Sequence, residues 1–146
     1  MNVNAIRERL ERSRTALLSA LEGVTERDFA AEVGPGLTVV AALATLAPGE
    51  RESIREARRV VAAPDRPRPS GNASATARAT PPQVVHDLAG ARYETLLFLD
   101  MLSQRPSGSK AEEETVHALL GAICDGETAA AEQVRARPAA QHANPA

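Results

Sequence analysis

The residues that most resemble a reactive pair are His117 and Cys124, which lie seven positions apart in one helical segment. Seven residues return to the same helix face but advance about 10 Å along the axis. That separation is too long for proton transfer between imidazole and thiol, or for a shared metal ion. We therefore expect His117 to be an exposed or boundary residue and Cys124 to be a small packing residue.

The other candidate groups are isolated. His86 and Asp87 fall in the first turns of an expected helix, where the helix dipole alone favours an acidic residue, and His142 falls in an expected frayed tail. Asp125 and Glu127 are near neighbours on a helix, but they point to different faces, and no second cluster supports a hard-cation site. No Gly-rich phosphate loop and no Ser/His/Asp arrangement occurs. The sequence predicts no catalytic residue, no cofactor and no metal.

Composition restricts the class of protein. The 146 residues fit one domain, and 17 basic against 19 acidic residues give a net charge of −2. This balance and an aromatic content of 2% argue against a nucleic-acid partner. The single cysteine excludes a disulfide within the chain. Residues 1–20 lack the apolar core of a signal peptide, and no apolar run approaches a membrane span, so we expect a cytoplasmic location without membrane contact.

The first half of the chain predicts two helical regions. Residues 4–22 form an amphipathic pattern that ends at Gly23, and residues 25–29 resemble a short capped turn. After a break at residues 34–36, Thr38 caps a segment, 39–46, that is apolar enough to be buried on most sides. Pro48-Gly49 predicts a kink or a break, and residues 50–61 alternate Glu and Arg, which predicts a largely solvated piece.

The second half predicts two longer helices. Residues 62–79 read as a long mobile connection, after which Thr80, Pro81 and Gln83 form a capping box. The stripe on the third helix comprises Val84, Leu88, Ala91, Thr95, Phe98 and Leu102, widened by Val85, Leu96 and Leu99. After a loop at 103–110, the last helix carries Val116, Leu119, Leu120, Ile123, Ala130 and Val134 inward and ends before Pro138.

These patterns predict an all-α, four-helix bundle spanning residues 1–137 as one domain, followed by a disordered tail at 138–146. An up-down-up-down order is the simplest topology. The connection at 62–79 is long enough to permit a crossover, so the helix order stays open.

Two segments resemble the DinB/YfiT-like superfamily, a group of small bacterial four-helix bundles that are often dimeric and often bind metal. The resemblance rests on Leu37-Thr38-Val39 and Leu43-Ala44-Thr45-Leu46, and on the last helix, where Gly126-Glu127-Thr128-Ala129-Ala130 precedes Glu132-Gln133-Val134. It implies three histidines that hold a divalent metal. The matching positions here are Thr45, Gly126 and Ala130, so the resemblance implies that the metal site has been lost.

Small residues remain at this place in the last helix. Ala122, Gly126 and Ala130 form a ridge with a spacing of four residues. One interpretation is close packing of a neighbouring helix on the ridge. The other is a small metal-free pocket lined by Thr45, Ala122, Gly126 and Ala130.

The sequence therefore favours a noncatalytic binding or interaction module of the DinB-like kind. The alternatives are a small-thiol-dependent transferase or isomerase of the mycothiol type, and a bundle that binds a small apolar ligand at a site of its own. A homodimer is a further expectation, supported by the apolar segment 39–46.

Overall fold

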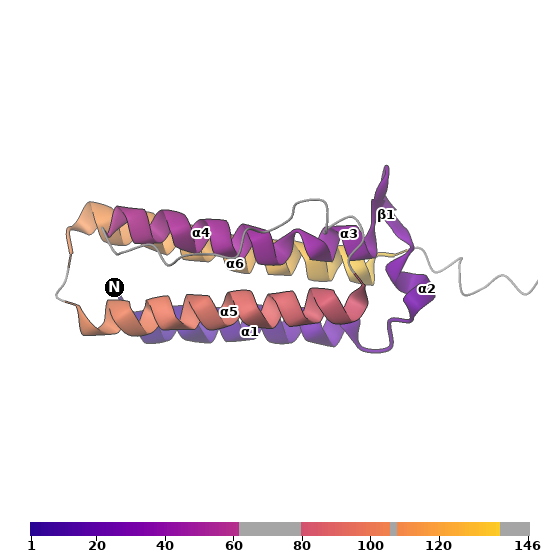
Figure 1. Cartoon of the computed structure of the whole chain (residues 1–146), viewed down its shortest axis with the longest axis horizontal. Helices are drawn as coiled ribbons and strands as arrows, with labels where there is room; N and C mark the ends of the chain where they lie inside the picture. The colour runs from indigo at the N-terminus through magenta and orange to yellow at the C-terminus, as the bar shows by residue number, and fades with distance from the viewer. Residues whose placement is uncertain (62–79, 106–107, 138–146) are drawn as a thin grey trace, which may run out of the picture.

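The part of the chain that the computed structural model describes, residues 1–61, 80–105 and 108–137, is mostly helical. This confirms the all-α class. Its elements are α1 (Val3–Leu21), α2 (Glu26–Phe29), β1 (Glu32–Gly34), β2 (Leu37–Thr38), α3 (Val39–Ala44), α4 (Leu46–Val60), α5 (Pro81–Gln104) and α6 (Lys110–Arg135) (Figure 1). None of these helices is long and apolar enough to cross a membrane. The connection and the tail predicted at 62–79 and 138–146 lie outside the described residues.

Side chains cap the helices where the sequence predicted caps. Thr25 and Thr80 head capping boxes with Asp28 and Gln83, and the Thr38 hydroxyl accepts a hydrogen bond from the backbone N–H of Ala41. Gly23 ends α1 with a positive φ of 75°, a conformation that costs glycine little. These features depend on a few neighbouring residues, which is why the sequence predicted them.

The break at residues 34–36 is the turn of a small antiparallel hairpin, β1–β2, which was not predicted. Gly36 supplies a φ of +69° in the turn, and the Val39 N–H then donates to the Ala31 carbonyl at the start of α3. Strands of three and two residues are too short to show alternation in a sequence.

The predicted break near Pro48-Gly49 occurs three residues earlier, between α3 and α4 at Thr45. Pro48 then lies in the first turn of α4, where its missing N–H has no helical partner to lose. The helix resumes its hydrogen bonds at once, since the Gly49 N–H donates to the Thr45 carbonyl at 3.1 Å.

Two predictions of side-chain exposure are wrong. The segment 50–61 is not largely solvated, because Glu50, Ile54 and Ala57 are buried in α4. On α5, Val85 and Leu96 are exposed rather than part of the core stripe. Leu119, which was predicted to point inward from α6, is half-buried and packs against the core. The many Glu and Arg residues of α4 made its narrow apolar face hard to recognise in the sequence. On α5, isolated apolar residues made the predicted apolar face wider than the one in the structure.

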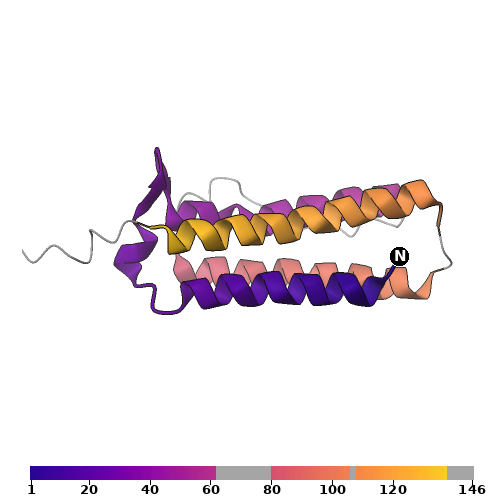
Figure 2. The same cartoon turned by 180° about the vertical axis from the view of Figure 1, so that it is seen from behind.

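The long helices pack lengthwise in the cyclic order α1, α6, α4, α5 (Figures 1 and 2). Helix α1 runs parallel to α6 and antiparallel to α5, and α4 runs parallel to α5. The pairs Arg51–Glu94 and Arg105–Val61 fix the parallel direction of α4 and α5. The alternating up-down-up-down order is therefore wrong, and α4 ends at the opposite end of the molecule from the start of α5.

The core consists of two apolar clusters at different levels along the helices. One contains Leu17, Val39, Leu43, Val84, Leu88 and Val134, and lies toward α3. The other contains Ile6, Leu10, Ile54, Phe98, Val116 and Leu120, and lies toward the far end of α4. Buried polar side chains lie between the two clusters.

Candidate functional site

Each long helix contributes one polar residue to its otherwise apolar seam at this middle level. These residues are Ser13 on α1, Glu50 on α4, Thr95 on α5 and Glu127 on α6. All four are buried, and Glu127 is only 1% exposed. A buried carboxylate is costly unless it is paired, so the surrounding charges decide what this layer can do.

Two arginines supply the opposite charges. The Glu50 carboxylate accepts hydrogen bonds from Arg92 Nε at 3.0 Å, from Arg14 Nη2 at 3.3 Å and from the Thr95 hydroxyl at 2.6 Å. The Glu127 carboxylate accepts hydrogen bonds from Arg14 Nε, Arg92 Nη2 and the Ser13 hydroxyl. Each arginine thus bridges both glutamates.

The quartet Arg14, Glu50, Arg92 and Glu127 therefore carries two positive and two negative charges. Burial alone lowers the pKa of the Arg92 guanidinium, but hydrogen bonds and charges from Glu50 and Glu127 outweigh it, so this pKa is raised. All four groups are engaged with one another. The layer is an internally neutral structural network rather than a free acid or base.

A cavity of about 280 Å³ lies next to this layer, between α4 and α6. We call it the α4/α6 cavity. Small and apolar side chains form most of its wall, and the two glutamates of the quartet contribute to it. Its lining comprises Thr45, Leu46, Gly49, Glu50, Ser53, Ala122, Ile123, Gly126 and Glu127.

The structure places Thr45, Ala122 and Gly126 together on this cavity. Ala130, the fourth residue proposed from the sequence, lies in the apolar core toward α3 and is 3% exposed. A Cβ added at Gly126 would meet Leu46 Cδ2 at 3.7 Å, an ordinary contact. Packing of α4 on α6 therefore does not require glycine at this position.

Metal ligands do not gather at the α4/α6 cavity. Across residues 1–61, 80–105 and 108–137, no three side chains of His, Cys, Asp or Glu are grouped to hold an ion. The hydroxyl of Thr45, one of the three positions at which the resemblance implied a lost ligand, donates to the Ala42 carbonyl at 2.8 Å. The carboxylates of the quartet are already paired with arginine.

The remaining candidates lie elsewhere. His86 and Asp87 are exposed on α5, and Asp125 is exposed and paired with Arg9 at 3.2 Å. His142 lies outside the described residues. His117 is exposed and Cys124 buried, and both line a different pocket, between α1 and α6. Burial raises the pKa of the Cys124 thiol, against smaller opposing effects of Ser13 and Arg9, so the thiol is a poor nucleophile.

Sequence reasoning missed the quartet, although a signal was present. Ser13, Glu50, Thr95 and Glu127 each occupy an inward position of a helical pattern, as in the run Leu120, Ile123, Glu127, Ala130 and Val134. A charged residue on an apolar seam predicts a buried partner of opposite charge. The pattern alone does not identify that partner, because Arg14 and Arg92 lie beside the apolar faces of their helices rather than on them.

Comparison of the chain with protein-family models, with curated proteins and with solved structures gave no match.

Proposed function

We propose that the protein is a metal-free four-helix bundle of the DinB/YfiT-like kind that acts as a noncatalytic binding module in the cytoplasm. Its ligand, on this proposal, is a small, neutral and mainly apolar molecule held in the α4/α6 cavity. The observation that carries the proposal is the convergence of Thr45, Ala122 and Gly126 on one cavity. These are positions where the resemblance implies a metal centre or its surroundings.

The neutral character of the ligand follows from the charges in and next to the cavity wall. Glu50 and Glu127 reach the cavity, but Arg14 and Arg92 neutralise both. A charged ligand would lose water there without gaining a free counter-ion. Leu46, Ile123 and Ala122 offer apolar surface, and only Thr45 and Ser53 add uncharged polar groups to the wall.

A titration with indole, a small neutral apolar probe, tests this proposal. We expect saturable shifts in a ¹H–¹⁵N spectrum of the full chain, centred on Gly49, Ala122 and Gly126. Ala122→Leu should weaken binding by about tenfold, because the larger side chain occupies the cavity.

Ala118→Leu is the matched control, since Ala118 is exposed on the same helix and lines neither the α4/α6 cavity nor the pocket between α1 and α6. It should bind indole like the parent protein. Equal binding by parent and Ala122→Leu, or shifts that centre away from α4 and α6, would contradict the proposal.

The alternative, a small-thiol-dependent transferase or isomerase, depends on a metal that lowers the pKa of the thiol of its cosubstrate. Elemental analysis of the purified protein separates the two functions. Stoichiometric zinc or nickel would favour the enzyme, and its absence after growth in metal-supplemented medium would favour the binding module.

A further inference from the structure

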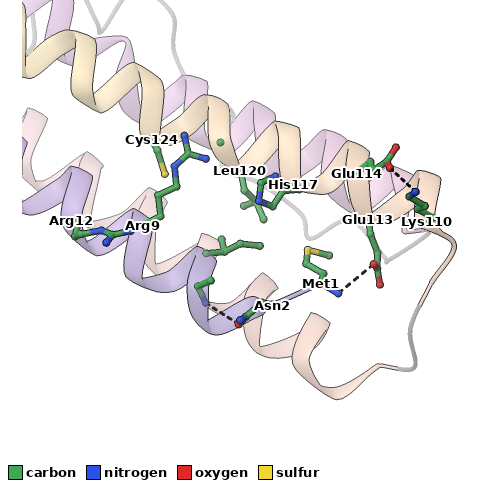
Figure 3. A pocket seen from close by; sticks show the side chains of 13 residues that line it. Met1, Asn2, Arg9, Arg12, Lys110, Glu113, Glu114, His117, Leu120 and Cys124 are labelled. Atoms are coloured by element: carbon green, nitrogen blue, oxygen red, sulfur yellow. Dashed lines mark hydrogen bonds and ion pairs between the residues drawn. The ribbon is translucent and has the colours of Figure 1, made fainter.

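A second, larger pocket lies on another face of the molecule, where α1 packs along α6. We call it the α1/α6 pocket; its volume is about 570 Å³, within the range of pockets that bind small organic molecules. Ile6 and Leu120 give it an apolar wall, and Arg9, Arg12 and Lys110 bring positive charge to it (Figure 3). It shares none of its lining residues with the α4/α6 cavity.

The charges of this pocket do not balance. The N-terminal amine pairs with Glu113 at 3.3 Å, Lys110 pairs with Glu114 at 3.9 Å, and Arg9 pairs with Asp125 at 3.2 Å. Arg12 forms no ion pair within the described ranges. Arg12 is therefore the cation of this pocket without an ion pair in the described part of the chain, with Glu8 and Glu11 beside it on another face of α1, and it lies at the end far from Lys110 (Figure 3).

Gly121 makes room for the guanidinium of Arg9, the other arginine of the pocket besides Arg12. A Cβ added there would lie 3.0 Å from Arg9 Nη1, which is closer than ordinary packing allows. Arg9 extends from α1 toward Cys124 on α6 (Figure 3), and its guanidinium is the group nearest to Gly121. A glycine inside a helix destabilises it relative to alanine, and the passage of Arg9 gives this glycine a structural reason.

We infer that the α1/α6 pocket binds a small organic monoanion with an apolar tail, such as a medium-chain carboxylate. The carboxylate would lie against Arg12 and Arg9, and the tail along Ile6 and Leu120. A single negative charge matches the one guanidinium of the pocket that makes no ion pair within the described residues, and the apolar wall distinguishes such a ligand from an inorganic anion.

Octanoate and its neutral analogue octanamide are suitable probes, followed in ¹H–¹⁵N spectra of the full chain. We expect saturable shifts at Ile6, Arg9 and Gly121 with octanoate, and binding of octanamide weaker by about tenfold, because a charge-assisted contact is lost. Arg12→Gln should weaken octanoate binding by a similar factor. Gly121→Ala should also weaken it, through displacement of Arg9, while leaving the helix at least as stable as before.

Arg55→Gln is the control for general electrostatic attraction, because it removes the same charge from the surface of α4. It should leave octanoate binding unchanged. Equal losses in Arg12→Gln and Arg55→Gln, equal binding of acid and amide, or no saturable binding would each overturn the inference. Ala122→Leu should not affect octanoate, so this site and the α4/α6 cavity succeed or fail separately.

Discussion

Glu127 is a charged residue that is only 1% exposed, and both bridging arginines pair with it. Glu127→Gln would leave Arg14 and Arg92 sharing a single carboxylate in a poorly solvated layer. We expect the free energy of unfolding to fall by about 3 kcal/mol, the lower part of the range for breaking a buried ion pair, because the arginines retain some solvent contact. Urea denaturation followed by circular dichroism measures this loss.

Glu132→Gln provides the comparison, since Glu132 is exposed on the same helix. Its denaturation midpoint should stay close to that of the parent. If both variants unfolded at the same urea concentration, the quartet would not stabilise the fold in the way its contacts indicate.

Cys124 gives a prediction about pH. Burial raises the pKa of its thiol, so the unfolded chain loses this proton at a lower pH than the folded chain. The thiol therefore adds stability below its ordinary pKa, about 8.5, and this contribution is lost as the pH rises toward the folded-state pKa. Between about pH 8 and pH 10 the parent should lose more stability than Cys124→Ala. Parallel stability curves for the two proteins would contradict this expectation.

At the scale of the elements, two threonines before successive helices allow a matched test of capping. The Thr38 hydroxyl accepts a hydrogen bond from the third residue of α3, whereas Thr45 makes no side-chain cap to α4. Thr38→Ala should therefore cost about 1 kcal/mol of stability, and Thr45→Ala much less. Thermal or urea unfolding of both variants measures the difference, and equal losses would refute the assignment.

The same contrast explains how much of the structure could be predicted. Caps, helix starts and the all-α class follow from residues close in sequence, such as Thr80 with Gln83. The direction of α5 relative to α4 does not, because it depends on contacts such as Arg51–Glu94 between distant segments. The α4/α6 cavity was foreseen only as a list of small residues, and the α1/α6 pocket was not foreseen, since its walls come from opposite ends of the chain.

At the scale of the whole molecule, an exposed apolar stripe on α5 bears on the expected homodimer. Val85, Tyr93 and Leu96 are 47%, 64% and 39% exposed, and their spacing brings them to one flank of the helix. Half of the segment 39–46 is taken up by the core, since Val39, Ala42, Leu43 and Ala44 are buried within the chain itself. We therefore expect a dimer to form through α5.

Replacing all three stripe residues with serine should convert such a dimer into a monomer, measured by size-exclusion chromatography with light scattering. The charges and the core residues stay unchanged, so the circular dichroism spectrum should remain helical. Leu18→Ser, which removes an exposed leucine from α1, is the control and should keep the parent's mass. A parent protein that is monomeric at high concentration would rule out the dimer.

The quartet also fixes how far each helix can slide along its neighbours. Layers of leucine and alanine repeat along the buried faces of the helices. An offset of one turn, about 5.4 Å, would therefore replace one apolar contact with another at little cost in packing energy. The same offset of α6 would carry the carboxylate of Glu127 away from both guanidiniums and into hydrocarbon. The charged layer thus sets the register of the four long helices. Only one alignment leaves every charge of the quartet beside a charge of opposite sign.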